Sequence, residues 1–83
     1  MNNKIYEVGI HWSYYSEYSD NCGDFAQRFF SSKSKAEIYF DELKERIRKG
    51  IYNRSNTGAE YIYIKKYELN VDNECPTIKT SKI

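Results

Sequence analysis

The stretch Ser32–Gly50, SKSKAEIYFDELKERIRKG, combines residues that cap helices with apolar residues at helical spacing. A serine near its start, Ser32 or Ser34, can accept hydrogen bonds from the first free amides, and Ser34 with Glu37 has the spacing of a capping box. Basic residues crowd the last turns, where they suit the helix dipole, and the final glycine can adopt the left-handed conformation that ends a helix. The stretch therefore predicts one amphipathic helix, with an apolar stripe formed by Ala36, Tyr39, Phe40, Leu43 and Ile47.

Segments with alternating apolar residues flank this helix on both sides. Lys4–Trp12 and Phe25–Phe30 precede it, Glu60–Asn70 follows it, and each is predicted to be a strand. In the last of these, Tyr67 continues the register of the tyrosines rather than that of the isoleucines. Either a bulge at Lys65–Lys66 exchanges the two faces, or Tyr67 belongs to a second, exposed face.

The order strand, strand, helix, strand predicts an α+β fold, a small three-stranded antiparallel sheet (ββαβ) with one helix packed on one face. The last strand is expected beside the first, which gives the order 2-1-3 and leaves one face open to solvent. Residues 1–70 are expected to form this domain, and residues 71–83 a C-terminal extension or, at most, a short edge strand at Thr77–Ile83. Ser13–Asp24 is predicted to be a long hairpin loop that ends in a turn at Asp20–Asp24, because Asn and Gly tolerate positive φ.

Residues capable of covalent or metal chemistry are few. His11 is the only histidine, the two cysteines Cys22 and Cys75 form no C-x-x-C pair, and the four glycines form no phosphate-binding loop. An active site would need a cleft that joins His11 to Cys22 or to a carboxylate. His11 and Cys22 flank the same predicted hairpin and could in principle supply a base and a nucleophile. Nothing in the local sequence supports that couple. We therefore expect no catalytic residues, no metal site and no cofactor.

The sequence also lacks the usual signals for export or membrane insertion. The N-terminus does not resemble a signal peptide, and no apolar run approaches the roughly 20 residues that a spanning helix needs. We expect a cytoplasmic protein whose two cysteines stay reduced, although a disulfide between Cys22 and Cys75 depends only on their geometry.

Tyrosine and serine dominate the segment that follows the first predicted strand. Tyrosine offers a wide amphipathic contact with only two torsions to freeze, and serine offers adaptable hydrogen bonds. The acidic residues of the segment have no basic residue between them, so a basic partner surface would suit them. The alternative is that the tryptophan and one or two tyrosines merely close the end of the core. The predicted partner-binding residues are Trp12, Tyr14, Tyr15, Glu17, Tyr18, Asp20 and Asp24.

A second candidate site is the basic end of the helix. Cations beside exposed rings can hold single-stranded nucleic acid through phosphate contacts and base stacking, and the same rings could instead form a homodimer interface. The alternative is ordinary solubilising charge, since the net charge of +1 is far from the strongly basic balance of typical nucleic-acid binders. The residues of this site are Lys44, Arg46, Arg48, Lys49 and Arg54, near Tyr52 and the strand tyrosines Tyr61, Tyr63 and Tyr67.

The segments Phe30–Leu43 and Glu60–Leu69 resemble small proteins encoded by phages and mobile elements, in which a serine-capped helix with an Ala-Glu start lies between strands. Anti-CRISPR and other anti-defence inhibitors are among these proteins. The resemblance is architectural and includes no diagnostic motif, so it carries over no functional residue. It implies a non-enzymatic inhibitor that binds a host protein, such as a bacterial nuclease complex. The alternative is a small nucleic-acid-binding or regulatory module.

Overall fold

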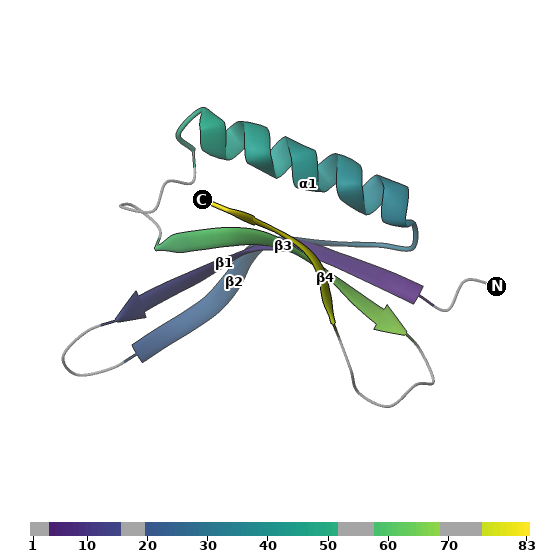
Figure 1. The fold of residues 1–83 in the computed structure, drawn as a ribbon, viewed down its shortest axis with the longest axis horizontal. Helices are drawn as coiled ribbons and strands as arrows, with labels where there is room; N and C mark the ends of the chain where they lie inside the picture. Colours follow the sequence, from purple (N-terminus) through teal and green to yellow (C-terminus); the bar gives the residue numbers. More distant parts are fainter. Residues whose placement is uncertain (1–3, 16–19, 52–57, 69–75) are drawn as a thin grey trace.

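The computed structural model describes residues 4–15, 20–51, 58–68 and 76–83. Their elements follow the order β1 (Lys4–Tyr15), β2 (Asp20–Phe30), α1 (Lys33–Arg48), β3 (Ala59–Glu68) and β4 (Thr77–Lys82). The strands form one antiparallel sheet in the order β2-β1-β3-β4, and α1 lies across one face of it (Figure 1). The predicted α+β class and the 2-1-3 order are confirmed. The sheet has four strands rather than three, because the short edge strand that the sequence allowed at Thr77–Ile83 is formed as β4 and pairs with β3.

Both ends of α1 are set by local hydrogen bonds. Ser32 is the N-cap, and its hydroxyl accepts a hydrogen bond of 3.5 Å from the amide of Lys35. At the other end the amide of Gly50 donates to the carbonyl of Ile47, and the amide of Ile51 donates to that of Arg46. Gly50 has a φ of 85°, which completes the left-handed termination that the sequence predicted.

The core lies between α1 and the face of the sheet that it covers. Tyr6, Val8 and Ile10 from β1 and Ile62 and Ile64 from β3 pack against the apolar stripe of the helix. Burial of side chains of this size stabilises the fold by about 1.5–3 kcal/mol each. Of the predicted stripe, Ile47 alone is only partly buried; the buried helix residues are Ala36, Tyr39, Phe40 and Leu43.

The hairpin between β1 and β2 has longer strands than the sequence indicated. β1 continues to Tyr15 and β2 begins at Asp20, so the described part of the predicted loop is paired strand. The predicted turn at Asp20–Asp24 is therefore wrong. Gly23 serves a different purpose there, because it lies opposite Trp12 and a Cβ atom on it would stand 2.8 Å from the indole nitrogen. Its missing side chain makes room for the tryptophan.

A bulge in β2 decides which of its side chains face the helix. The β1–β2 register shifts between Val8 and Ile10, and Ala26 lies at this irregularity with a φ of 55°. Beyond the bulge Phe25 pairs with Ile10 and packs at the margin of the core. The hydroxyl of Tyr39 donates a hydrogen bond of 2.7 Å to the carbonyl of Ala26, which ties the bulge to the helix.

The strand β3 resolves the two alternatives left open for Tyr67. The β1–β3 register runs without a shift from Lys4 opposite Glu68 to His11 opposite Tyr61, so no bulge at Lys65–Lys66 separates β3 from β1. The irregularity in this region belongs to the pairing of β3 with β4. Tyr67 therefore lies on the face that α1 leaves open.

Candidate functional site

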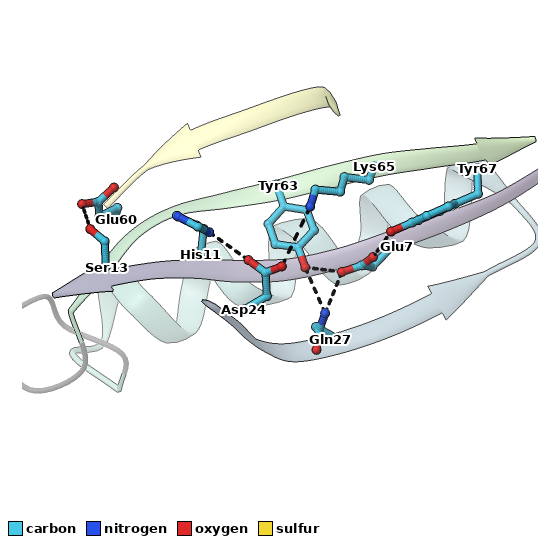
Figure 2. Close-up of polar contacts among 9 residues, drawn as sticks. All are labelled: Glu7, His11, Ser13, Asp24, Gln27, Glu60, Tyr63, Lys65 and Tyr67. Atoms are coloured by element: carbon cyan, nitrogen blue, oxygen red, sulfur yellow. Dashed lines mark hydrogen bonds and ion pairs between the residues drawn. The ribbon is translucent and has the colours of Figure 1, made fainter. Parts of the chain in front are cut away.

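The sheet face opposite α1, which we call the open face, carries a connected group of polar and aromatic side chains. They come from three strands and most of them are drawn in Figure 2. We call this group the open-face network; its members are Glu7 and His11 of β1, Asp24 and Gln27 of β2, and Tyr61, Tyr63, Lys65 and Tyr67 of β3.

Glu7 is the centre of one half of the network. Its side chain is buried, and its carboxylate accepts hydrogen bonds from the hydroxyl of Tyr63, from that of Tyr67 at 2.6 Å and from the amide of Gln27 at 2.8 Å. Burial by itself raises the pKa of the Glu7 carboxyl. The three hydrogen bonds and the charge of Lys65 outweigh burial and bring this pKa below its ordinary value. Glu7 is thus a satisfied structural carboxylate.

Tyr63 is buried although it belongs to the open face. Its ring end lies over Gly9, and the ammonium of Lys65 stands 4.9 Å from the ring centroid. Only 1% of the residue is exposed. Burial, together with the hydrogen bond to Glu7, raises the pKa of the Tyr63 hydroxyl well above its usual range. The expectation that Tyr63 offers an exposed ring is therefore wrong, because the missing side chain of Gly9 lets the ring lie flat on the sheet.

His11 and Asp24 form the centre of the other half. Nδ1 of His11 lies 2.9 Å from Oδ1 of Asp24, and the imidazole stacks on Tyr61 with ring centroids 4.9 Å apart. Nζ of Lys65 approaches the other oxygen of Asp24 at 3.9 Å. A carboxylate at this position orients the imidazole, as in many catalytic sites. The imidazole pairs with Asp24 rather than with Cys22, the nucleophile that the sequence offered.

The predicted partner-binding residues fall into four groups. Trp12 is half-buried over Gly23, and Asp24 is engaged by His11 and Lys65, so both take part in the fold. Tyr14 is 62% exposed. Tyr15 and Asp20 pair with each other at the end of the hairpin, while Glu17 and Tyr18 lie outside the described residues.

The end of this hairpin forms a two-stranded projection. β1 pairs with β3 only as far as Trp12 opposite Ala59, whereas its pairing with β2 continues to Tyr15 opposite Asp20. We call residues 13–15 and 20–22 the β1–β2 arm; it extends beyond the start of β3 in Figure 1. The amide of Ser13 donates a 3.1 Å hydrogen bond to the carbonyl of Gly58, and its hydroxyl donates to Glu60, which fixes the base of the arm (Figure 2).

The second predicted site is divided by the fold. Lys44, Arg48 and Lys49 are exposed and Arg46 is half-buried near the end of α1, where Arg48 pairs with Glu45 at 2.7 Å. The described strand tyrosines lie on the open face, on the other side of the sheet from α1. This separation follows from the alternation of side chains along β3, which directs its isoleucines to the helix and its tyrosines away. Arg54 and Tyr52 lie outside the described residues.

Sequence reasoning missed the network around Glu7. The available signal was Glu7, a carboxylate on the same face of the sheet as the tyrosines of β3. This shared face becomes visible only once the register of β1 and β3 is known. Cys22 is an exposed free thiol, and Cys75 lies outside the described residues.

The described ranges hold neither a cluster of metal ligands nor a membrane-spanning helix. No three His, Cys, Asp or Glu residues there lie close enough together to hold a metal ion. The helix that the structure describes is not long and apolar enough to cross a membrane. Comparison of the chain with protein-family models, with curated proteins and with solved structures found no match.

Proposed function

We propose that this chain is a non-enzymatic binding protein whose β1–β2 arm docks on a partner protein. The observation that carries the proposal is the position of Tyr14, which is 62% exposed on a projection whose base is fixed to the sheet. Tyrosines are enriched among the residues that dominate binding energy at protein interfaces. The proposed partner is a host protein that handles nucleic acid, such as a nuclease complex.

The rigid base of the arm supports this function energetically. Association costs free energy for every loop and side chain that becomes ordered at the interface. Here the strands are already paired, Trp12 packs over Gly23, and Ser13 is hydrogen bonded to Gly58. An interface built on this arm would therefore lose less conformational entropy than one built on an unpaired loop.

The choice of partner follows from charge and from the resemblance to anti-defence inhibitors. Asp24 is engaged by His11 and Lys65, so the acidic character of the hairpin rests on Asp20 and on Glu17 in the sequence. A partner with a basic surface would be steered towards such a projection and matched by it. Surfaces that hold nucleic acid have this charge, and an inhibitor that covers one needs no chemistry of its own.

The test is affinity capture from a bacterial host, followed by measurement of the dissociation constant with the identified partner. Tyr14→Ala should weaken binding by about tenfold or more, which corresponds to about 1.4 kcal/mol. Phe29→Ala is the matched control, because Phe29 is an aromatic residue of the same 62% exposure that lies outside the arm. If Phe29→Ala weakens binding and Tyr14→Ala does not, the arm is not the docking site.

A second function is favoured by the stacked pair of His11 and Tyr61. Both side chains are half-buried on the open face, and Lys82 of β4 lies directly opposite Tyr61. Partly exposed rings beside a cation could stack bases of single-stranded nucleic acid. A titration with an oligonucleotide at several salt concentrations tests this alternative, because the affinity must fall steeply with salt if phosphates are contacted. Tyr61→Ala should abolish such binding, and salt-independent or absent binding would exclude it.

A further inference from the structure

The side of the molecule away from β2 has an open groove between α1 and β4. It has a volume of about 480 Å³, and Ile47, Ile62 and Ile83 give it an apolar floor. The core cluster draws α1 over β1 and β3, and Phe25 and Phe30 of β2 pack at its margin, so the helix is displaced from β4. Lys79 reaches back from β4 and places its ammonium 4.7 Å from the ring centroid of Phe40. The groove is therefore an apolar surface that the described residues do not fill.

The free edge of β4 runs along this groove. Among the described residues β4 pairs with β3 alone and ends the sheet. The amide of Ile83 donates a 2.9 Å hydrogen bond to the carbonyl of Glu60 of β3. Since backbone groups alternate in direction along an antiparallel strand, those of Thr80 and Lys82 point away from β3. The register shift at Ile78 interrupts the alternation beyond them. An edge of this kind is a template on which another extended chain can pair.

The charge of the β4 edge and the groove determines which kind of extended chain can bind there. β4 carries Lys79 and Lys82 and no acidic residue, and Lys44 and Arg48 stand on the helix side of the groove. The acidic side chains that line the groove are Asp41 and Glu45. Glu45 and Arg48 bind each other at 2.7 Å and cancel, which leaves Lys44, Lys79 and Lys82 against Asp41. The edge and the groove together are therefore basic.

The same charges disfavour a second copy of this chain as the occupant. Two β4 strands side by side would place Lys79 and Lys82 of each copy close to the lysines of the other. Like charges on neighbouring strands destabilise a sheet, and lysines on edge strands are a common defence against self-association. An acidic strand would meet attraction where a second copy meets repulsion.

We propose that the edge of β4 and the adjoining groove bind an extended, acidic segment of a partner protein as a fifth strand of the sheet. Alternate side chains of this segment are apolar and enter the groove over Ile47, Ile62 and Ile83. The side chains between them are acidic and lie on the open side near Lys82, while Lys44 on the helix side adds to the positive field along this edge. This surface lies at the opposite edge of the sheet from β2, so it is separate from the β1–β2 arm.

A synthetic peptide tests this surface on the full chain. The probe is the peptide Glu-Val-Glu-Ile-Glu-Val-Glu-amide with fluorescein on its N-terminus, and its counterpart carries lysine in place of every glutamate. The binding of both peptides is followed by fluorescence polarisation. The acidic peptide should bind at least about tenfold more tightly than the basic one. The double variant Lys44→Glu with Lys82→Glu should reverse this preference. Equal affinity for the two peptides, or no binding of the acidic peptide at about 1 mM, would overturn the proposal.

Strand pairing itself is tested at Thr80. Thr80→Pro removes an amide that points outward, so it deletes a hydrogen bond to the added strand but none to β3. It should weaken binding of the acidic peptide by about tenfold, whereas Thr80→Ala keeps the amide and should retain the affinity. Hydrogen exchange at Thr80 and Lys82 should slow when the peptide is added.

Two results would reject pairing at this edge. One is unchanged affinity in a folded Thr80→Pro variant. The other is a dimer in sedimentation experiments that Thr80→Pro dissociates, because a second copy would then be the occupant. If thermal melting shows that Thr80→Pro is unfolded, the reversal of peptide preference by the charge variant remains as the decisive experiment.

Discussion

The ring of Tyr63 lies so close to Gly9 that a Cβ atom on residue 9 would stand 2.6 Å from the phenol oxygen and 2.9 Å from Cζ. No left-handed backbone requires glycine here, since the positive-φ glycines of the described chain are Gly50 and Gly58. Space is the requirement. The glycine lets a large ring cross β1 and bring its hydroxyl to Glu7, which is the contact that holds the open-face network together (Figure 2).

We expect Gly9→Ala to destabilise the fold by about 1–3 kcal/mol, the range for a buried overlap that forces side chains to move. Gly23→Ala is the control, because its Cβ would meet Trp12 at a similar distance of 2.8 Å. Trp12 is only half-buried and can shift, whereas Tyr63 is held by Glu7 and Lys65. Urea unfolding at neutral pH measures both variants. A larger loss in Gly23→Ala than in Gly9→Ala would contradict this account.

Glu7 should make the stability of the protein depend on pH in the acidic range. Its carboxyl has a pKa below the ordinary value in the folded state, because the hydrogen bonds and Lys65 outweigh burial, so the unfolded chain binds the proton more readily. The resulting stability is complete above the ordinary pKa of 4.5 and is lost as the pH falls through the folded value. Glu7→Gln should lower the free energy of unfolding at pH 7 by about 1–3 kcal/mol and flatten its decline in acid.

The measurement is a series of urea unfolding curves between about pH 2 and pH 7, for the native chain and for Glu7→Gln. Added salt distinguishes the stability that Glu7 contributes from that of surface ion pairs such as Glu45 with Arg48, since salt screens exposed charges far more than buried ones. The difference between the two chains should persist in concentrated salt. If it disappears there, the contribution of Glu7 is an exposed charge effect.

Tyr63 should make the protein less stable as the pH rises into the alkaline range. Burial and the hydrogen bond to Glu7 raise the pKa of its hydroxyl, so the folded state keeps a proton that the unfolded chain releases near the ordinary pKa of 10.0. The stability from this group is complete below that pH and falls as the pH rises above it. Tyr63→Phe should be less stable than the native chain near pH 7 and should decline less steeply between about pH 9.5 and 11. Parallel declines of the two chains would show that Tyr63 is not the group responsible.

The sequence was most informative where the controlling contacts are local. The helix, its cap near Ser32 and its end at Gly50 depend on residues within a few positions of one another, and all three were predicted. Of the two serines considered, Ser32 is the cap. The strand positions of β3 also followed from its own alternation, but the placement of Tyr67 on the open face was one of two alternatives that the sequence left open.

Features that depend on residues far apart in the chain were not predictable. Gly23 resembled a turn residue, but its role is set by Trp12 on the neighbouring strand. Glu7 bonds to tyrosines that lie 56 and 60 positions away, so its burial required the register of β1 and β3. The same distinction applies to the candidate sites. The polar residues around Tyr14 in the sequence indicate its exposure, whereas the contact of Asp24 with His11 arises only when the strands pair.

The bulge in β2 offers a test of backbone strain at Ala26, whose φ of 55° is unusual for a residue with a side chain. Glycine adopts this conformation freely, and the left-handed region costs other residues about 1–2 kcal/mol. Ala26→Gly should therefore leave the stability unchanged or raise it by up to about 1 kcal/mol, after the loss of one partly buried methyl group is subtracted. Ala36→Gly makes the same chemical change in the buried face of α1 and should destabilise by about 1–2 kcal/mol. Thermal or urea unfolding of both variants measures this difference in stability. Equal destabilisation of the two variants would mean that Ala26 carries no backbone strain and that its methyl group stabilises the bulge.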